Sequence, residues 1–156
     1  MISTLQLSER NVRRAIVEWL FRNGYGRNLR ERGTGDHGID IQVRHNRYGR
    51  YFIIECKGDP VRRIKSLNSR REVCFLLALG QIASRMKVGA ALYRYGIGFP
   101  ETYREKVLRR LPWTFCKKTN LCVLLVSKAG KVGCVTWREL KRHQPRSSVA
   151  GGAVAP

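Results

Sequence analysis

The pattern of apolar and polar positions predicts a β-hairpin in the first half of the chain. Two short apolar runs, 39–43 (IDIQV) and 51–57 (YFIIECK), flank a polar, glycine-containing turn at 46–49 (NRYG). Successive side chains of a strand point to opposite faces, so Glu55 and Lys57 share one face of the second strand. The intervening Cys56 then points to the other face, toward the core.

The register of this hairpin brings two carboxylates together. If the turn is symmetric, His45 pairs with Arg50 and Asp40 lies directly opposite Glu55, with Cβ atoms roughly 4.5–5.5 Å apart. Like charges at that separation destabilise a sheet, so a cation is expected between them. The pair and the neighbouring Lys57 therefore indicate either a site for a hard divalent cation such as Mg2+ or a solvated hairpin face. A single β-bulge would change this register.

A helical pattern precedes the hairpin, over Leu7–Asn23, with Ser8 as its N-cap and Asn23-Gly24 as its stop. Steps of 100° per residue place Glu9 on the apolar side, which also carries Val12. Such a carboxylate either faces a cleft or lies at the start of the helix, where it favours the helix dipole and reaches solvent.

After the first helix, the chain alternates between strand-like and helical patterns. Strands are predicted at 25–31, 88–96, 121–127 and 132–137, and helices at 69–87, 101–110 and 137–142. The loop at 32–38 contains three glycines but lacks the spacing of a P-loop. Its Asp36 is a second candidate acid, ranked behind Asp40.

The helix predicted at 69–87 opens with a capping box formed by Ser69 and Glu72. It is apolar nearly all round, which predicts that it is largely buried. Gln81 and Arg85 are polar exceptions one turn apart, and they form a stripe that either approaches the strand face or faces solvent.

The composition of the chain predicts its domain size and a class of binding partner. A chain of 156 residues with 43% hydrophobic residues predicts one globular domain, residues 1–142, followed by a disordered tail at 143–156. The net charge of +20 predicts a polyanionic partner, most commonly nucleic acid. The basic side chains predicted to contact a phosphate backbone are Arg62, Arg63, Lys65, Arg70, Arg71 and Arg85.

The five cysteines include no C-x-x-C pair, and they are interpreted as small core residues of a protein in a reducing compartment. No run reaches the roughly 18 apolar residues of a membrane span, and the N-terminus lacks the apolar region of a signal peptide. We therefore expect a cytoplasmic protein that does not associate with membranes.

The order of these elements resembles that of the PD-(D/E)XK nuclease superfamily, whose restriction endonuclease-like fold includes archaeal-type Holliday junction resolvases. The resemblance extends over about residues 5–96 and depends on Asp40 in one strand and Glu55-Cys56-Lys57 at the end of the next. It implies an α/β fold: an αβββαβ core with a central mixed sheet flanked by helices, to which C-terminal strands are added.

The resemblance also implies roles for individual residues. Asp40, Glu55 and the carbonyl of Cys56, together with Glu9, would hold one or two Mg2+ ions, with Mn2+ as a substitute. Lys57 would position the attacking water or stabilise charge. Gln81 is similar to a glutamine that some branches of the superfamily carry on the helix after the E-x-K motif.

The function implied is that of a Mg2+-dependent DNA endonuclease, with branched or structured DNA as one substrate class and a homodimer as the expected assembly. No small-molecule cofactor is expected. Two alternatives remain from the same residues: a non-catalytic nucleic-acid-binding module on the same fold, and a basic RNA-binding protein of ribosomal type.

Overall fold

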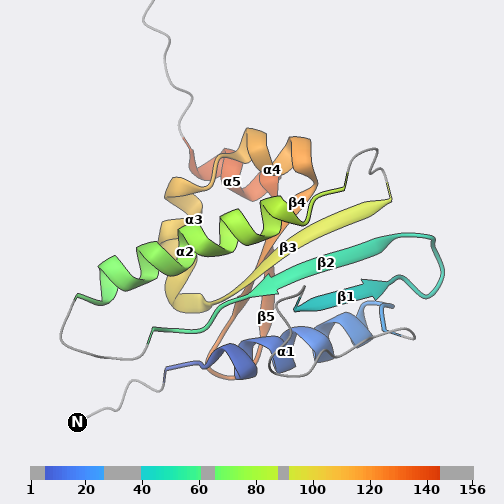
Figure 1. Cartoon of the computed structure of the whole chain (residues 1–156), viewed down its shortest axis with the longest axis horizontal. Coiled ribbons are helices and arrows are strands. Elements are labelled where there is room, and N and C mark those ends of the chain that lie inside the picture. The colour runs from blue at the N-terminus through green and yellow to red at the C-terminus, as the bar shows by residue number, and fades with distance from the viewer. Residues whose placement is uncertain (1–5, 27–39, 61–65, 88–91, 145–156) are drawn as a thin grey trace, which may run out of the picture.

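The computed structural model describes residues 6–26, 40–60, 66–87 and 92–144. Its centre is a five-stranded sheet whose strands lie side by side in chain order (Figure 1). The strands are β1 (Ile41–Arg44), β2 (Tyr51–Cys56), β3 (Tyr93–Pro100), β4 (Leu121–Val126) and β5 (Val132–Val135). The helices are α1 (Glu9–Arg22), α2 (Leu67–Ser84), the 3-10 turn η1 (Glu101–Tyr103), α3 (Arg104–Arg110), α4 (Trp113–Thr119) and α5 (Trp137–His143).

The sheet is mixed, as predicted. β1 and β2 are antiparallel, β2, β3 and β4 run parallel to one another, and β5 returns antiparallel to β4. Helix α1 packs on one face, and α2 to α5 pack on the other (Figure 1). The described part of the chain is therefore an α/β structure with an apolar core on each side of the sheet, which confirms the predicted fold class. The division into a domain at 1–142 and a tail at 143–156 stays a prediction.

Several boundaries differ from the predicted ones. The strand expected to end at Gly96 continues to Pro100, and α4 was not predicted. Most of the strand expected at 25–31 falls outside the described residues, although Tyr25 forms a single antiparallel bridge with His45.

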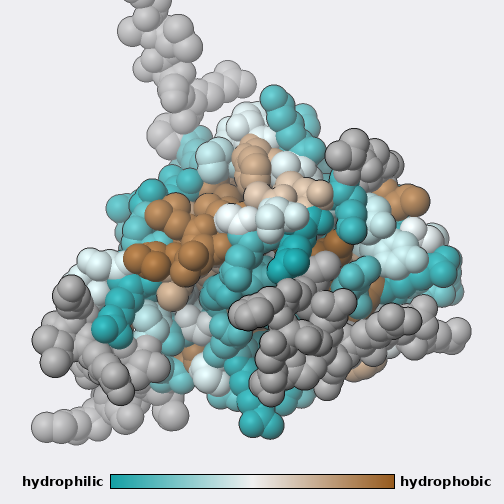
Figure 2. All heavy atoms as spheres, in the orientation of Figure 1, coloured by the Kyte–Doolittle hydropathy of each residue, from teal (hydrophilic) through white to brown (hydrophobic). Residues whose placement is uncertain are grey.

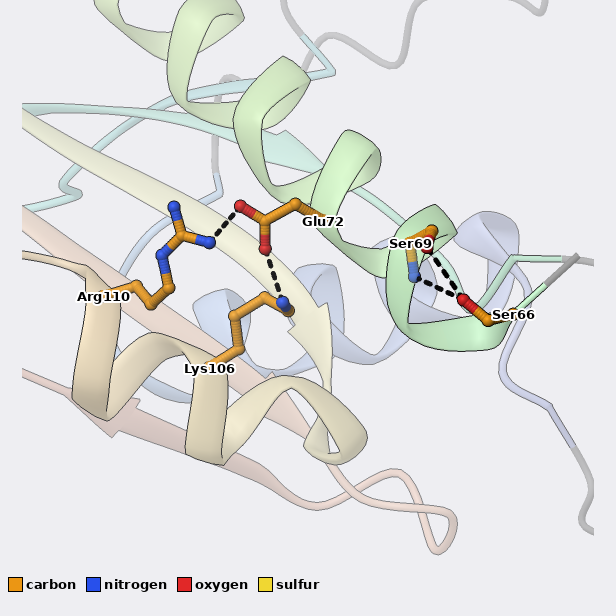
Figure 3. A network of polar contacts seen from close by, with 5 residues as sticks. All are labelled: Ser66, Ser69, Glu72, Lys106 and Arg110. Carbon is orange, nitrogen blue, oxygen red and sulfur yellow. Dashed lines mark hydrogen bonds and ion pairs between the residues drawn. The ribbon is translucent and has the colours of Figure 1, made fainter.

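The start of α2 corrects the predicted capping box. The N-cap is Ser66, whose side chain accepts the Ser69 N–H, rather than Ser69. The carboxylate of Glu72 turns away from the helix start and binds Lys106 and Arg110 of α3 (Figure 3). Glu72 therefore fastens α2 to α3 instead of capping α2.

Helix α2 is also less buried than predicted. Phe75, Ala78 and Ile82 face the sheet, but the side chains of Val73, Leu76 and Leu77 are more than half exposed. Figure 2 shows apolar surface along this helix. An all-round apolar sequence does not reveal which side of the helix will be covered, and here only one side is.

Helix α1 matches its prediction closely, including its Ser8 cap. It packs tightly on β3: a Cβ added to Gly98 would lie 2.3 Å from Ile16 Cδ1. The cysteines are all unpaired, and three of the five are buried, in agreement with their interpretation as core residues. None of the helices among the described residues has the length and apolar character needed to cross a bilayer.

Candidate active site

The hairpin has the predicted register. Ile41 pairs with Ile54, and Arg44 pairs with Tyr51. This is the register in which His45 would face Arg50, as the symmetric turn predicts. Asp40, which directly precedes β1, is therefore opposite Glu55 at the end of β2. Its negative charge is close enough to raise the pKa of Glu55.

Asp40 extends the hairpin ladder through its side chain. Its Oδ2 accepts the backbone N–H of Cys56 at 2.7 Å. The next N–H, that of Lys57, points the other way and donates to the Gly98 carbonyl of β3 at 2.9 Å. In an extended strand the N–H and C=O of one residue lie on the same edge, so the Cys56 carbonyl points to the side where Asp40 lies.

Glu55 is the buried acid of this site, with only 3% of its surface exposed. Its Oε1 accepts from Lys57 Nζ at 3.1 Å. Burial, and then the charge of Asp40, raise the pKa of Glu55, although Lys57 and Arg85 act in the opposite direction. Burial alone would lower the pKa of Lys57, but Glu55, Glu9 and Asp40 together raise it. The site therefore holds more negative charge than one lysine offsets, which favours a cation.

Glu9 reaches this region because the start of α1 abuts the end of β2. A Cβ added to Gly58 would lie 2.3 Å from the backbone nitrogen of Glu9 and 2.9 Å from the Leu7 carbonyl oxygen. Glu9 is exposed in the first turn of the helix, as the solvent-facing interpretation predicts. Its charge nevertheless raises the pKa of both Lys57 and Cys56, so Glu9 contributes to the negative potential at this end of β2.

The polar stripe of α2 faces the same region. Arg85 is close enough to lower the pKa of Glu55. Gln81 Oε1 and Arg85 Nε are buried, and neither has a hydrogen-bond partner among the described residues. Of the two readings of the stripe, the structure supports an approach to the strand face and not a solvated surface. Arg85 was predicted only to contact phosphate, and in the structure its charge also acts on Glu55.

The basic run contributes less to the described site. Asp36 and the side chains at positions 62, 63 and 65 lie outside the described residues. Arg70 is half-buried in the first turn of α2. Arg71 donates to Asp59 at 3.4 Å, and its guanidinium lies 5.9 Å from the centre of the Tyr103 ring. Contact of these residues with nucleic acid stays a prediction.

Asp59 has a structural role that the sequence did not reveal. Its carboxylate accepts from Leu7 N–H at 3.1 Å, from Thr102 Oγ1 at 2.7 Å and from Arg71, while its own N–H donates to the Leu7 carbonyl at 2.8 Å. It therefore ties the approach to α1, the end of β2 and the start of α2 together around the site. Its position directly after Lys57-Gly58 is the one signal in the sequence that links it to the acids.

The donor set fits a cation that needs few protein ligands. The described residues contain no group of three or more His, Cys, Asp or Glu side chains gathered as a metal cage. Two opposed carboxylates with an adjacent backbone carbonyl suit Mg2+, which binds through one or two carboxylates and keeps several waters. Metals that require a full set of side-chain ligands, such as structural zinc, do not fit this arrangement.

Comparison with known proteins gives little further information. No protein-family model matches the chain, and no curated protein matches it. Among solved structures, a XisH family protein from Nostoc punctiforme PCC 73102 has a TM-score of 0.49 and 15% sequence identity, with 81% of this chain and 99% of that chain covered. A fdxN element excision controlling factor protein from Anabaena variabilis has a TM-score of 0.46 and 14% identity, with 81% and 100% covered. Similarity of this degree gives no ground for assigning either protein's role to this chain.

Proposed function

We propose that the chain is a Mg2+-dependent DNA endonuclease of the PD-(D/E)XK type. The observation that carries the proposal is the opposition of Asp40 and Glu55 across the β1–β2 hairpin, with Lys57 bonded to Glu55. Two facing acids, one of them buried, repel each other and cost stability locally. Their placement together has a physical reason if they bind a cation that acts on a polyanion.

Asp40, Glu55 and the Cys56 carbonyl, together with Glu9, would hold the metal. When bound, Mg2+ would polarise the scissile phosphate and lower the pKa of a coordinated water. Oδ2 of Asp40 already accepts the Cys56 N–H, which fixes the carboxylate and leaves its other oxygen for a cation. Mn2+ offers the same preference for oxygen ligands and is expected to substitute.

Lys57 and Arg85 supply positive charge close to Glu55. Lys57 Nζ is held by Glu55 at 3.1 Å, where it can orient a water or stabilise charge that develops on a phosphate. Arg85 follows α2 directly, and its charge lowers the pKa of Glu55. Guanidinium groups bind phosphate through paired N–H donors, so Arg85 would help to hold a phosphate beside the acids.

The second candidate is a nucleic-acid-binding module without catalysis. The pairing of Lys57 with Glu55 favours it, because a lysine can occupy the position of the cation and leave no metal requirement. Calorimetric titration with Mg2+ or Mn2+ separates the candidates. An endonuclease should have a metal site that disappears in Asp40→Asn, whereas a pure binder should show no metal binding. A basic RNA-binding protein likewise predicts no metal dependence and no cleavage.

The deciding assay incubates the full chain with supercoiled, linear, single-stranded and four-way-junction DNA, in Mg2+ or in EDTA. Cleavage should need the metal and should fall roughly a hundredfold or more in Asp40→Asn and in Glu55→Gln. Glu105→Gln is the matched control, because it removes an equivalent charge from an exposed carboxylate on α3 and should cleave normally. Cleavage in EDTA, or equal activity in all three variants, would contradict the proposal. Sedimentation of the same samples tests the expected homodimer.

A further inference from the structure

A polar hollow lies at the other end of the sheet from Asp40 and Glu55. It is a cavity of about 360 Å³ between the residues that begin β2, β3 and β4 and those that begin α5. Parallel strands present their amino ends together, so Arg50, Arg94 and Asn120 come from three neighbouring strand starts to line it. Five strand residues at roughly 3.3 Å each place Arg50 about 17 Å from Glu55 along β2.

The cavity is strongly basic. Among the described residues, three arginines line it, Arg50, Arg94 and Arg138, and no aspartate or glutamate does. None of the three forms an ion pair with a carboxylate of the described residues. Three guanidinium charges without a carboxylate partner, set around one small hollow, produce a local positive potential, and such a potential concentrates anions.

Two of the three guanidinium groups are held in place by the fold. Arg94 is half-buried: its guanidinium lies 4.8 Å from the centre of the Phe52 ring, and Nη2 donates to Cys134 Sγ at 3.5 Å. The guanidinium of Arg138 lies 4.9 Å from the centre of the Trp137 ring, which also lines the cavity. Guanidinium groups fixed in this way lose little freedom on binding, and their planar N–H donors match phosphate oxygens.

We propose that this cavity binds the phosphate of a nucleotide, at a site separate from the carboxylates. Its volume lies at the lower end of the roughly 300–1,000 Å³ typical of small-ligand sites. Tyr93 and Trp137 give it an apolar wall beside the arginines, as a ligand with both a base and a phosphate requires. The nucleotide is either free or part of a DNA strand. Binding here does not depend on the proposed nuclease activity.

The test is calorimetric titration of the full chain in EDTA, in which the carboxylate site cannot load metal. Deoxyadenosine monophosphate should bind at one site, and deoxyadenosine, which lacks the phosphate, should not. The variant Arg50→Gln/Arg138→Gln removes two exposed side chains and should bind at least about a hundredfold more weakly, tenfold for each arginine. The variant Lys128→Gln/Lys131→Gln removes the same charge from the exposed β4–β5 turn and should bind normally.

Competition identifies the source of the nucleotide. If a short single-stranded oligonucleotide displaces the monophosphate, the site binds a strand of DNA. If the monophosphate stays bound, the site binds a free nucleotide. Circular dichroism of both double variants should match the wild type, because all four side chains are exposed. No binding of the monophosphate, equal binding of the nucleoside, or the same loss in both double variants would overturn the proposal.

Discussion

Replacing Gly58 with alanine tests how closely α1 must approach β2 to form the candidate site. The new Cβ would lie 2.3 Å from Glu9 N, 2.7 Å from the Ser8 carbonyl carbon and 2.9 Å from the Leu7 carbonyl oxygen. All three atoms belong to the backbone, so no side-chain rotation can relieve the contact. Gly58 does not have a positive φ, so the substitution adds no backbone strain of its own.

The expected cost follows from these contacts. Overpacking in a well-packed region costs about 1–3 kcal/mol, and alanine returns about 0.4–1 kcal/mol by restricting the unfolded chain. Contacts with rigid backbone favour the upper part of the first range, so we expect a net loss of about 2 kcal/mol. For a chain of this size, that loss lowers Tm by roughly 4–8 °C. The start of α1 would move outward, and Glu9 would move with it.

Gly80→Ala is the matched control. It makes the same chemical change in the exposed interior of α2, where an added Cβ meets nothing within 4 Å. Alanine favours a helix over glycine by about 1 kcal/mol, so this variant should melt roughly 2–4 °C higher than the wild type. Thermal unfolding followed by circular dichroism measures both. A Gly58→Ala protein as stable as the wild type would refute the close approach of α1 to β2.

Three further predictions concern titratable groups. Burial above all raises the pKa of Glu55 from its ordinary value of 4.5, so the ionised carboxylate costs stability that Glu55→Gln should recover in EDTA at pH 8. The gain in Tm should vanish near pH 4, where the wild type is protonated, and an equal gain at both pH values would contradict this account. The bond to Lys106 lowers the pKa of Glu72, so Glu72→Gln should lower Tm at neutral pH, and the difference should fade as the pH drops below 4.5. A hydrogen bond with Cys122 lowers the pKa of Cys134 to about 7, so its alkylation, followed by mass spectrometry, should be half-maximal near pH 7 rather than pH 9.

The hairpin could be predicted from the sequence because its register depends on short-range features. A polar turn and two alternating strands were enough to place Asp40 opposite Glu55. The cap and apolar side of α1 are equally local, and both agree with the structure. The same reasoning explains why Cys56 is buried while Lys57 stays at the site.

Features that depend on distant parts of the chain were not predictable in this way. The apolar sequence of α2 does not show which side the sheet will cover, and so the exposure of Leu76 and Leu77 was missed. Gly96 resembled a strand end, although β3 continues through Gly98, where the absence of a side chain leaves room for Ile16 of α1. The cavity beside Arg94 exists only because β3 lies between β2 and β4, an order that no local pattern specifies.

The close packing of α1 against the sheet also gives a way to recognise related chains. A Cβ added to Gly58 would meet the backbone of the residues that lead into α1, whereas one added to Gly98 would meet the end of the Ile16 side chain. A chain that keeps this close packing is therefore expected to keep the first glycine, because backbone atoms cannot rotate away. Glycine directly after the E-x-K sequence is a search pattern based on steric exclusion, and a second glycine at the spacing of Gly58 and Gly98 supports it. Overall similarity need not persist for such a pattern to detect distant relatives.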